Sequence, residues 1–208
     1  MPRPSEVANC YIARKTMQRE ALTQQLNFLK EIDRLKSVIR QSPLLDQSRK
    51  ENSAEHSWHL AMYALLLQEY AAEQVNVSRV IQMLLLHDVV EVDVGDTPIH
   101  GGHSREQQAQ QEYKAAVRLF GMLPEMQGEQ LLQLWQEFES AETSDAKFAK
   151  ALDRFQPLLV NVFTSGGTWR ESNVSYEQVL QRYGPEIKKG APELWVICEQ
   201  WVAEHFAS

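Results

Sequence analysis

The fold is decided by residues 79–91, which read RVIQMLLLHDVVE. The apolar centre of this stretch predicts a buried helix that Ser78 caps and that runs to about Glu91. His87 and Asp88 come directly after the apolar run. An ionisable pair at the end of a buried helix is costly unless both side chains are hydrogen-bonded or bind a metal. The stretch therefore predicts both a core helix and a place where chemistry can occur.

The rest of the chain continues the helical pattern. Apolar residues recur at spacings of three and four, only 9 of the 208 residues are glycine, and no segment alternates with a period of two. The expected helices cover residues 18–40, about 54–73 (capped by Asn52 or Ser53), 79–91, 106–119, 131–139, 145–162 (kinked at Pro157), 176–183 and 192–206. Glycine and proline mark residues 93–104 and 164–168 as loops. We expect an all-α, single-domain bundle.

Composition limits the class of protein. With 43% apolar and 24% charged residues, the chain can bury a sizeable core and is not disordered. Its longest apolar runs, residues 60–67 and 83–86, are far below the roughly 18 residues of a membrane span. No apolar segment of the secretory type follows the N-terminus. Two cysteines, Cys10 and Cys198, cannot form a disulfide framework, so we expect reduced thiols and a cytoplasmic location.

The net charge is −7, which argues against a dedicated nucleic-acid-binding protein because such proteins carry a basic stripe. The sequence also lacks a glycine-rich GxxxxGK phosphate loop. A small anionic substrate held by one or two arginines and a metal stays compatible with this charge.

Two further side chains stand out because they interrupt apolar helical faces. His56 opens a helix whose continuation is apolar, and Asp153 lies on the inward stripe of the helix over residues 145–162. Each of these residues also has an explanation without a metal: a histidine can be hydrogen-bonded in the core, and a carboxylate can be exposed at a helix end. Taken with His87 and Asp88, they form a mixed nitrogen and oxygen set that suits Mn²⁺, Fe²⁺, Co²⁺, Ni²⁺ or Zn²⁺ better than Mg²⁺.

The order of a histidine, a His-Asp pair and a distant aspartate resembles the HD-domain metal-dependent phosphohydrolases. The similar words are residues 51–57 (ENSAEHS), 85–91 (LLHDVVE), 94–96 (VGD) and 150–154 (KALDR). They are most similar to the branch that contains bacterial 5'-deoxynucleotidases and related small hydrolases. The resemblance implies an HD-type bundle over residues 1–208 with the metal site in its core. Residues 33–163 carry the motifs, and helices over about 174–206 are appended.

The resemblance also implies roles for particular residues. One divalent ion is expected to be bound by four side chains, namely His56, His87, Asp88 and Asp153. Glu91 matches the position that orients or deprotonates the attacking water, and it follows Asp88 by one helical turn. Asp96 matches an acidic position that assists proton transfer near the leaving group.

Substrate binding is expected from two further residues. Arg40 ends a stretch, residues 34–40, that resembles the one whose last arginine grips the substrate phosphate. Trp58 neighbours His56 and is expected to line the pocket. Gln41 stands where close relatives carry a tryptophan, which leaves the preference for sugar and base open.

These residues together predict a phosphomonoesterase that acts on nucleoside or deoxynucleoside 5'-monophosphates. Two alternatives remain, a nucleotide-binding or sensing protein with little catalysis and a phosphodiester or triphosphate hydrolase that uses the same metal. His100 and His103 lie in the glycine-rich loop, where a mobile flap is favoured over a second metal site.

A homodimer is a further expectation. The C-terminal apolar residues either cap the domain or form a two-fold interface; they are Leu194, Trp195, Ile197, Trp201, Val202 and Phe206.

Overall fold

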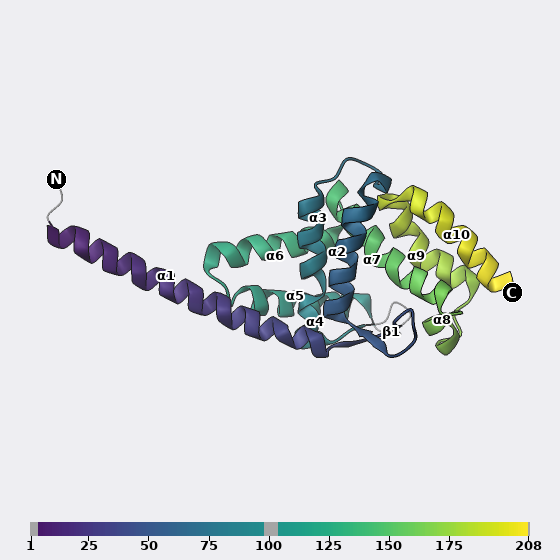
Figure 1. Ribbon diagram of the computed structural model, residues 1–208, viewed down its shortest axis with the longest axis horizontal. Helices are drawn as coiled ribbons and strands as arrows, with labels where there is room; N and C mark the ends of the chain where they lie inside the picture. The colour runs from purple at the N-terminus through teal and green to yellow at the C-terminus, as the bar shows by residue number, and fades with distance from the viewer. Residues whose placement is uncertain (1–3, 98–103, 208) are drawn as a thin grey trace.

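The structure, a computed structural model, describes residues 4–97 and 104–207, with side chains from Lys15 onward except that of residue 105. Its α-helices are α1 (Pro4–Ile32), α2 (Ser53–Leu67), α3 (Val77–Leu86), α4 (Glu91–Val94), α5 (Arg105–Phe120), α6 (Glu125–Ser140), α7 (Ser144–Phe163), α8 (Gly167–Glu171), α9 (Tyr176–Gly190) and α10 (Pro192–Ala207). Short 3₁₀ helices are η1 (Asp33–Ser37), η2 (Gln68–Tyr70) and η3 (His87–Val90), and the two strands are β1 (Ile39–Pro43) and β2 (Lys50–Asn52). The expected helical bundle is confirmed (Figure 1).

Helix α7 is the centre of the bundle, because it contacts α2, α3, α6, α9 and α10. The core falls into two apolar clusters. The larger one gathers around α7, α9 and α10 and includes Met83 and Leu84 of α3, and the smaller one gathers around α5 and α6 and includes Val89 and Val90 of η3. The His-Asp pair therefore lies where the two clusters meet.

The helices on either side of this junction are capped by asparagines. Asn52 accepts a hydrogen bond from the backbone of Glu55, whose carboxylate accepts one in return, so a capping box starts α2 as expected. Asn76, rather than the expected Ser78, caps α3. Helix α3 also ends sooner than expected, since the chain tightens into η3 at His87.

The expected single helix over residues 18–40 is wrong at its C-terminal end. Helix α1 stops at Ile32, η1 follows, and the chain then forms β1, which pairs antiparallel with β2 through Ile39 and Asn52. The N-terminal part of α1 projects from the body of the molecule (Figure 1). Its leucine stripe, at Leu22, Leu26 and Leu29, is exposed, so the amphipathic pattern here does not mark a core-facing helix.

Four other boundaries differ from expectation. Helix α2 ends at Leu67, where the chain tightens into η2, rather than near residue 73. Helix α6 begins at Glu125, six residues before the expected start. Helix α9 continues through Pro185 to Gly190 instead of ending at Tyr183. The expected loop over residues 164–168 contains the start of α8.

The C-terminal helix caps the domain. Leu194, Trp195 and Val202 are buried in the larger cluster, whereas Ile197 and Phe206 keep substantial exposure. Over the part of the chain that the structure describes, every helix is too short or too polar to cross a bilayer.

Candidate metal centre

His87 and Asp88 are placed by the change from α3 to η3. The His87 ring packs against Phe138, with ring centroids 4.9 Å apart, and its Nδ1 donates to the carbonyl of Leu84 at 2.8 Å. The backbone carbonyl of His87 accepts a hydrogen bond from the indole of Trp135. These contacts hold the ring with its Nε2 directed at the carboxylate of Asp88, 3.0 Å away.

His56 enters from α2 and Asp153 from α7. The capping box fixes the first turn of α2, so His56 falls on the inward face and is fully buried. Its Nε2 lies 3.0 Å from Oδ1 of Asp153, and the same oxygen is 3.4 Å from Nε2 of His87. Segments that are 97 positions apart in the sequence are thus brought into contact.

The four side chains fit a divalent cation. One donor atom each from His56, His87 and Asp88 lie within 4.8 Å of one another, and Asp153 adjoins both histidines. Because Nδ1 of His87 donates to the backbone, its Nε2 carries a lone pair and no proton. It therefore makes no hydrogen bond to the carboxylate of Asp88 that it faces, and it has no other partner among the described residues. A buried polar atom left in this way is expensive unless something else, such as a cation, uses it.

Glu91 and Asp96 adjoin this cluster from the chain that follows η3. Glu91 is buried and accepts a hydrogen bond from the hydroxyl of Ser53. Burial, and after it the charge of Asp88, raise the pKa of Glu91 to about 9. Burial also raises the pKa of Asp96 above its usual value, although Arg40 opposes the shift.

Arg40 balances these carboxylates from β1. Its Nη1 lies 2.9 Å from Asp88, 3.4 Å from Asp96 and 4.0 Å from Glu91. Burial alone would lower the pKa of this guanidinium, but the three carboxylates raise it above its normal value, so Arg40 is a permanent cation. The strand, rather than the expected helix, aims the side chain into the site.

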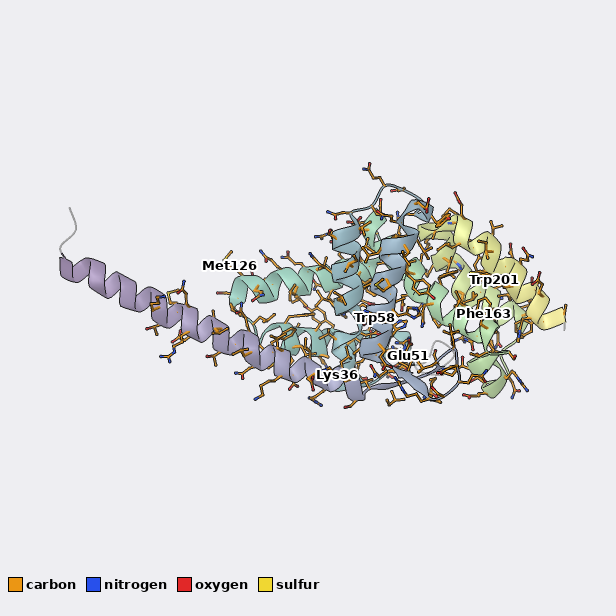
Figure 2. The ribbon with its side chains drawn as sticks, in the orientation of Figure 1. Lys36, Glu51, Trp58, Met126, Phe163 and Trp201 are labelled. Carbon is orange, nitrogen blue, oxygen red and sulfur yellow. The ribbon has the colours of Figure 1, made fainter. Side chains whose placement is uncertain are left out.

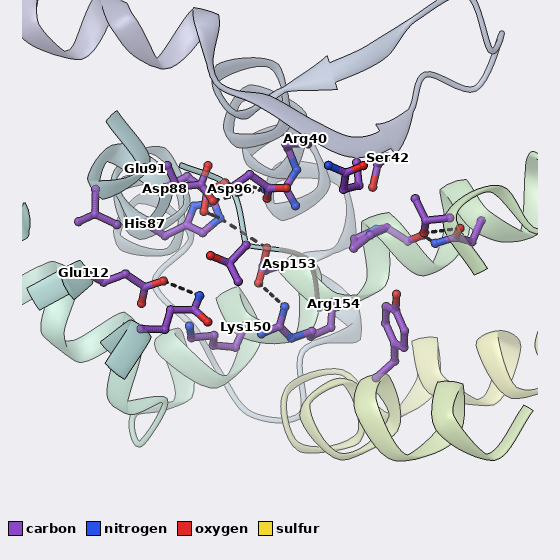
Figure 3. Close-up of a pocket in the computed structure, with 18 of the residues that line it drawn as sticks. Arg40, Ser42, His87, Asp88, Glu91, Asp96, Glu112, Lys150, Asp153 and Arg154 are labelled. Atoms are coloured by element: carbon purple, nitrogen blue, oxygen red, sulfur yellow. Dashed lines mark hydrogen bonds and ion pairs between the residues drawn. The ribbon is translucent and has the colours of Figure 1, made fainter. Parts of the chain in front are cut away.

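A cavity of about 390 Å³ opens beside the cluster. Figure 3 shows Arg40 and Arg154 on opposite sides of it, with Asp153 between them. The charged side chains that line it are Arg40, Asp88, Glu91, Asp96, Glu112, Glu139, Lys150, Asp153, Arg154 and Glu171. A cavity with this mixture of charges can hold a small anion together with a cation.

Two expected residues do not line the cavity. His56 is fully buried next to it, in contact with Asp153. Trp58 lies on the outer face of α2, 63% exposed (Figure 2), and it does not line the cavity. Two residues beyond His56 correspond to a rotation of about 200° around a helix, which turns Trp58 away from the site. Gln41 lines the cavity. His100 and His103, with the possible second metal and the flap, lie outside the described residues.

Sequence reasoning missed several neighbours of the site. Glu51 is buried behind His56, with a carboxylate oxygen 3.4 Å from the Nδ1 of that ring. Arg154 lies 3.4 Å from the carboxylate of Asp153, and Lys150 lines the cavity one turn earlier on α7. Glu51, Lys150 and Arg154 all lie in the motif segments quoted above, so the sequence contained them, but the sequence analysis assigned them no role.

Two buried histidines and two buried aspartates in a helical bundle, with a further carboxylate and an arginine beside them, offer the donors that a divalent cation and a small anion need. The family model for the HD domain matches residues 32–195, and the chain belongs to this family.

Relatives of known name agree with this assignment. The chain is similar to a "5'-deoxynucleotidase" of Erwinia tasmaniensis, with 32% identity over 77% of this chain and 86% of that protein. It is 31% identical to a bovine (Bos taurus) "5'-deoxynucleotidase HDDC2" over 69% of each chain. The crystal structure of a "Predicted metal-dependent phosphohydrolase" from Magnetospirillum magnetotacticum MS-1 superposes with a TM-score of 0.85 and 48% identity, covering 89% of this chain and 93% of that one.

Proposed function

We propose that the protein is a metal-dependent phosphomonoesterase that releases phosphate from nucleoside or deoxynucleoside 5'-monophosphates. The observation that carries this proposal is the meeting of His56, His87, Asp88 and Asp153 beside a charged cavity that Glu91 also lines. The names of the relatives from Erwinia tasmaniensis and Bos taurus support the substrate class.

A divalent cation held by the four ligands would supply Lewis-acid activation of the phosphoryl group and of a water. The mixed nitrogen and oxygen donors favour one Mn²⁺, Fe²⁺, Co²⁺, Ni²⁺ or Zn²⁺ ion over Mg²⁺. The positive charge of such an ion would counteract the burial and the repulsion from Asp88 that raise the pKa of Glu91, and would leave this carboxylate ionised and able to accept a proton.

The chain's own residues then divide the chemistry. Glu91 accepts the proton of the attacking water, and the hydroxyl of Ser53 keeps its carboxylate in place. Arg40 faces the phosphoryl oxygens, where negative charge is present before the reaction and is redistributed during it. Asp96, 3.4 Å from Arg40, serves the leaving alcohol as a proton donor.

The first experiment measures phosphate release from a panel of nucleoside and deoxynucleoside 5'-monophosphates after loading the purified protein with Mn²⁺ or Co²⁺. Turnover of at least one monophosphate is expected. A protein that binds the metal and turns over none of them, while it cleaves a diester or a triphosphate or only binds nucleotides, refutes the proposal in favour of the corresponding alternative.

Glu91→Ala separates catalysis from nucleotide sensing. Loss of the general base should lower kcat/KM about 10²-fold or more, whereas metal content measured by elemental analysis should stay the same because Glu91 is not one of the four ligands. A variant that retains full activity would contradict the role of Glu91. If the native protein and the variant bind nucleotides equally well and neither releases phosphate, the nucleotide-sensing alternative is favoured.

We also propose that the protein acts in the cytoplasm as a homodimer. Free, buried Cys198 is compatible with a reducing compartment. The face of α2 that carries Trp58, Met62, Leu65 and Leu66 leaves apolar side chains exposed, which favours a second copy of the chain as its cover. Leu66→Glu should shift the mass measured by light scattering to that of a monomer, and cell fractionation tests the compartment.

A further inference from the structure

Glu51 is a buried carboxylate that the proposed reaction does not use. It lies on β2, is 4% exposed and does not line the cavity. One of its oxygens accepts a hydrogen bond from the amide of Gln156 at 3.2 Å. The other oxygen faces the site from behind, 3.4 Å from Nδ1 of His56 and 3.7 Å from Nε of Arg40.

These three facing atoms form a group of their own. Oε2 of Glu51, Nδ1 of His56 and Nε of Arg40 are all buried, and none has a hydrogen-bond partner among the described residues. Each would bear a desolvation penalty if left alone. Since the donors and the acceptor face one another within a few tenths of an ångström of bonding distance, a small movement satisfies all three.

The contact with His56 decides which nitrogen of the ring is available to a cation. Nε2 of His56 faces the ligand cluster beside Asp153, so it can bind a metal only when the ring proton is on Nδ1. A carboxylate beside Nδ1 selects that tautomer and makes the ring a stronger ligand. His87 is held differently, because its Nδ1 donates to the neutral carbonyl of Leu84.

The contact with Arg40 links the same carboxylate to the other side of the site. The Nη1 end of Arg40 reaches Asp88 and Asp96, and its Nε faces Glu51. A charge behind the guanidinium fixes the direction in which its outer nitrogens point, which matters for a side chain that must meet a phosphate.

We propose that Glu51 is a positioning residue that holds His56 in the tautomer able to bind the metal and, at the same time, orients Arg40 toward the substrate phosphate. The inference rests on the proposed function. It extends the proposed function by assigning to Glu51, a residue behind the proposed ligands, the coupling of metal binding to phosphate binding.

Glu51→Gln keeps the size of the side chain and removes the charge. Glu55→Gln is the matched control: it makes the same change four residues later, at a carboxylate that pairs with Arg49 on the surface, and glutamine still completes a capping box. The Kd for Mn²⁺ is measured by calorimetry on chelator-stripped protein, and circular dichroism verifies the fold of each variant.

We expect Glu51→Gln to weaken Mn²⁺ binding about 10- to 100-fold and Glu55→Gln to leave the Kd within about twofold of the native value. At saturating Mn²⁺, the Kd for inorganic phosphate should also rise in Glu51→Gln and not in the control. An unchanged Mn²⁺ affinity in a folded Glu51→Gln protein overturns the inference while leaving the proposed function intact. Native protein that binds no Mn²⁺ overturns both.

A measurement on the native chain keeps the inference testable if the variant fails to fold. Nitrogen NMR of the histidine rings in the Zn²⁺-loaded protein reports the tautomer directly, and the His56 signals are assigned by comparison with His56→Asn. We expect a proton on Nδ1 and Zn²⁺ bound to Nε2. A His56 ring that carries its proton on Nε2, or that binds through Nδ1, contradicts the role of Glu51.

Discussion

Three carboxylates, those of Asp88, Glu91 and Asp96, share the guanidinium of Arg40. Burial, and after it the repulsion among carboxylates that one positive charge does not balance, raise the pKa values of Glu91 and Asp96. A carboxyl whose pKa is higher in the folded than in the unfolded chain binds more protons when folded. Between the normal value of 4.5 and about 9, ionisation of Glu91 therefore makes the metal-free protein less stable as the pH rises.

Glu91→Gln should remove this cost. Because the glutamine keeps an acceptor for Ser53 and is neutral without taking up a proton on folding, we expect the metal-free variant to be more stable than the native protein at pH 8, by about 1 to 2 kcal/mol. For a chain of this length, that is an increase in Tm of several degrees.

Thermal unfolding in chelator at pH 5 and pH 8 checks this expectation. The advantage of the variant should shrink at pH 5, which is close to the normal pKa of Glu91 in the unfolded chain, so that protonating this carboxyl on folding costs little there. A variant that is no more stable than the native protein at pH 8 would show that the carboxyl of Glu91 does not destabilise the metal-free fold.

At the scale of elements, the start of α2 sets the position of His56. The side chain of Asn52 accepts from the backbone of Glu55, and Asn52→Ala removes this cap. We expect a loss of about 1 kcal/mol of stability and, because His56 lies in the adjoining turn, a weaker affinity for Mn²⁺. Asn52→Asp keeps an accepting oxygen and should restore both quantities, as measured by denaturant unfolding and calorimetry. If Asn52→Ala changes neither the stability nor the Mn²⁺ affinity, packing alone places His56.

Helices α7 and α9 cross closely at Gly190, and this crossing supports the helix that carries Asp153. A Cβ at position 190 would lie 2.1 Å from the backbone carbonyl oxygen of Lys147, which is rigid backbone and cannot move aside alone. Gly190→Ala should therefore displace one helix and cost about 1 to 3 kcal/mol. Chemical denaturation measures this cost, and a variant of native stability would show that α9 can shift freely.

Most of the helices were predictable from the sequence, and so was the gathering of His56, His87, Asp88 and Asp153. The hairpin that delivers Arg40 was not. Spacings of three and four continue from Leu29 through Leu35 to Ile39, so the pattern favours one helix where the chain turns into η1 and β1. The strands are stabilised by pairing with each other, which is a contact between separate segments that local periodicity does not encode. Glu51 escaped notice for the same reason, since its importance comes from Arg40 and Gln156, residues brought to it by the fold.

On the scale of the whole molecule, the site joins four separate segments: β1, α2, the turn into η3, and α7. The four proposed metal ligands span residues 56–153 and lie where the two apolar clusters meet. In the unfolded chain these side chains are far apart and bind a cation weakly. Metal binding therefore favours the folded state as a whole, and its free energy adds to that of the fold.

Saturating metal should accordingly raise the unfolding temperature of the entire domain. At a free Mn²⁺ concentration 1,000 times the Kd, the linkage gives about 4 kcal/mol, which corresponds to an increase in Tm of about 10 °C for a domain of this size. Differential scanning fluorimetry of stripped protein, with and without Mn²⁺, measures the shift, and His87→Asn is the control that should abolish most of it. If the native protein and this variant respond equally, the cation stabilises the fold from some place other than the four ligands, and the metal centre described above would not be where the ion binds.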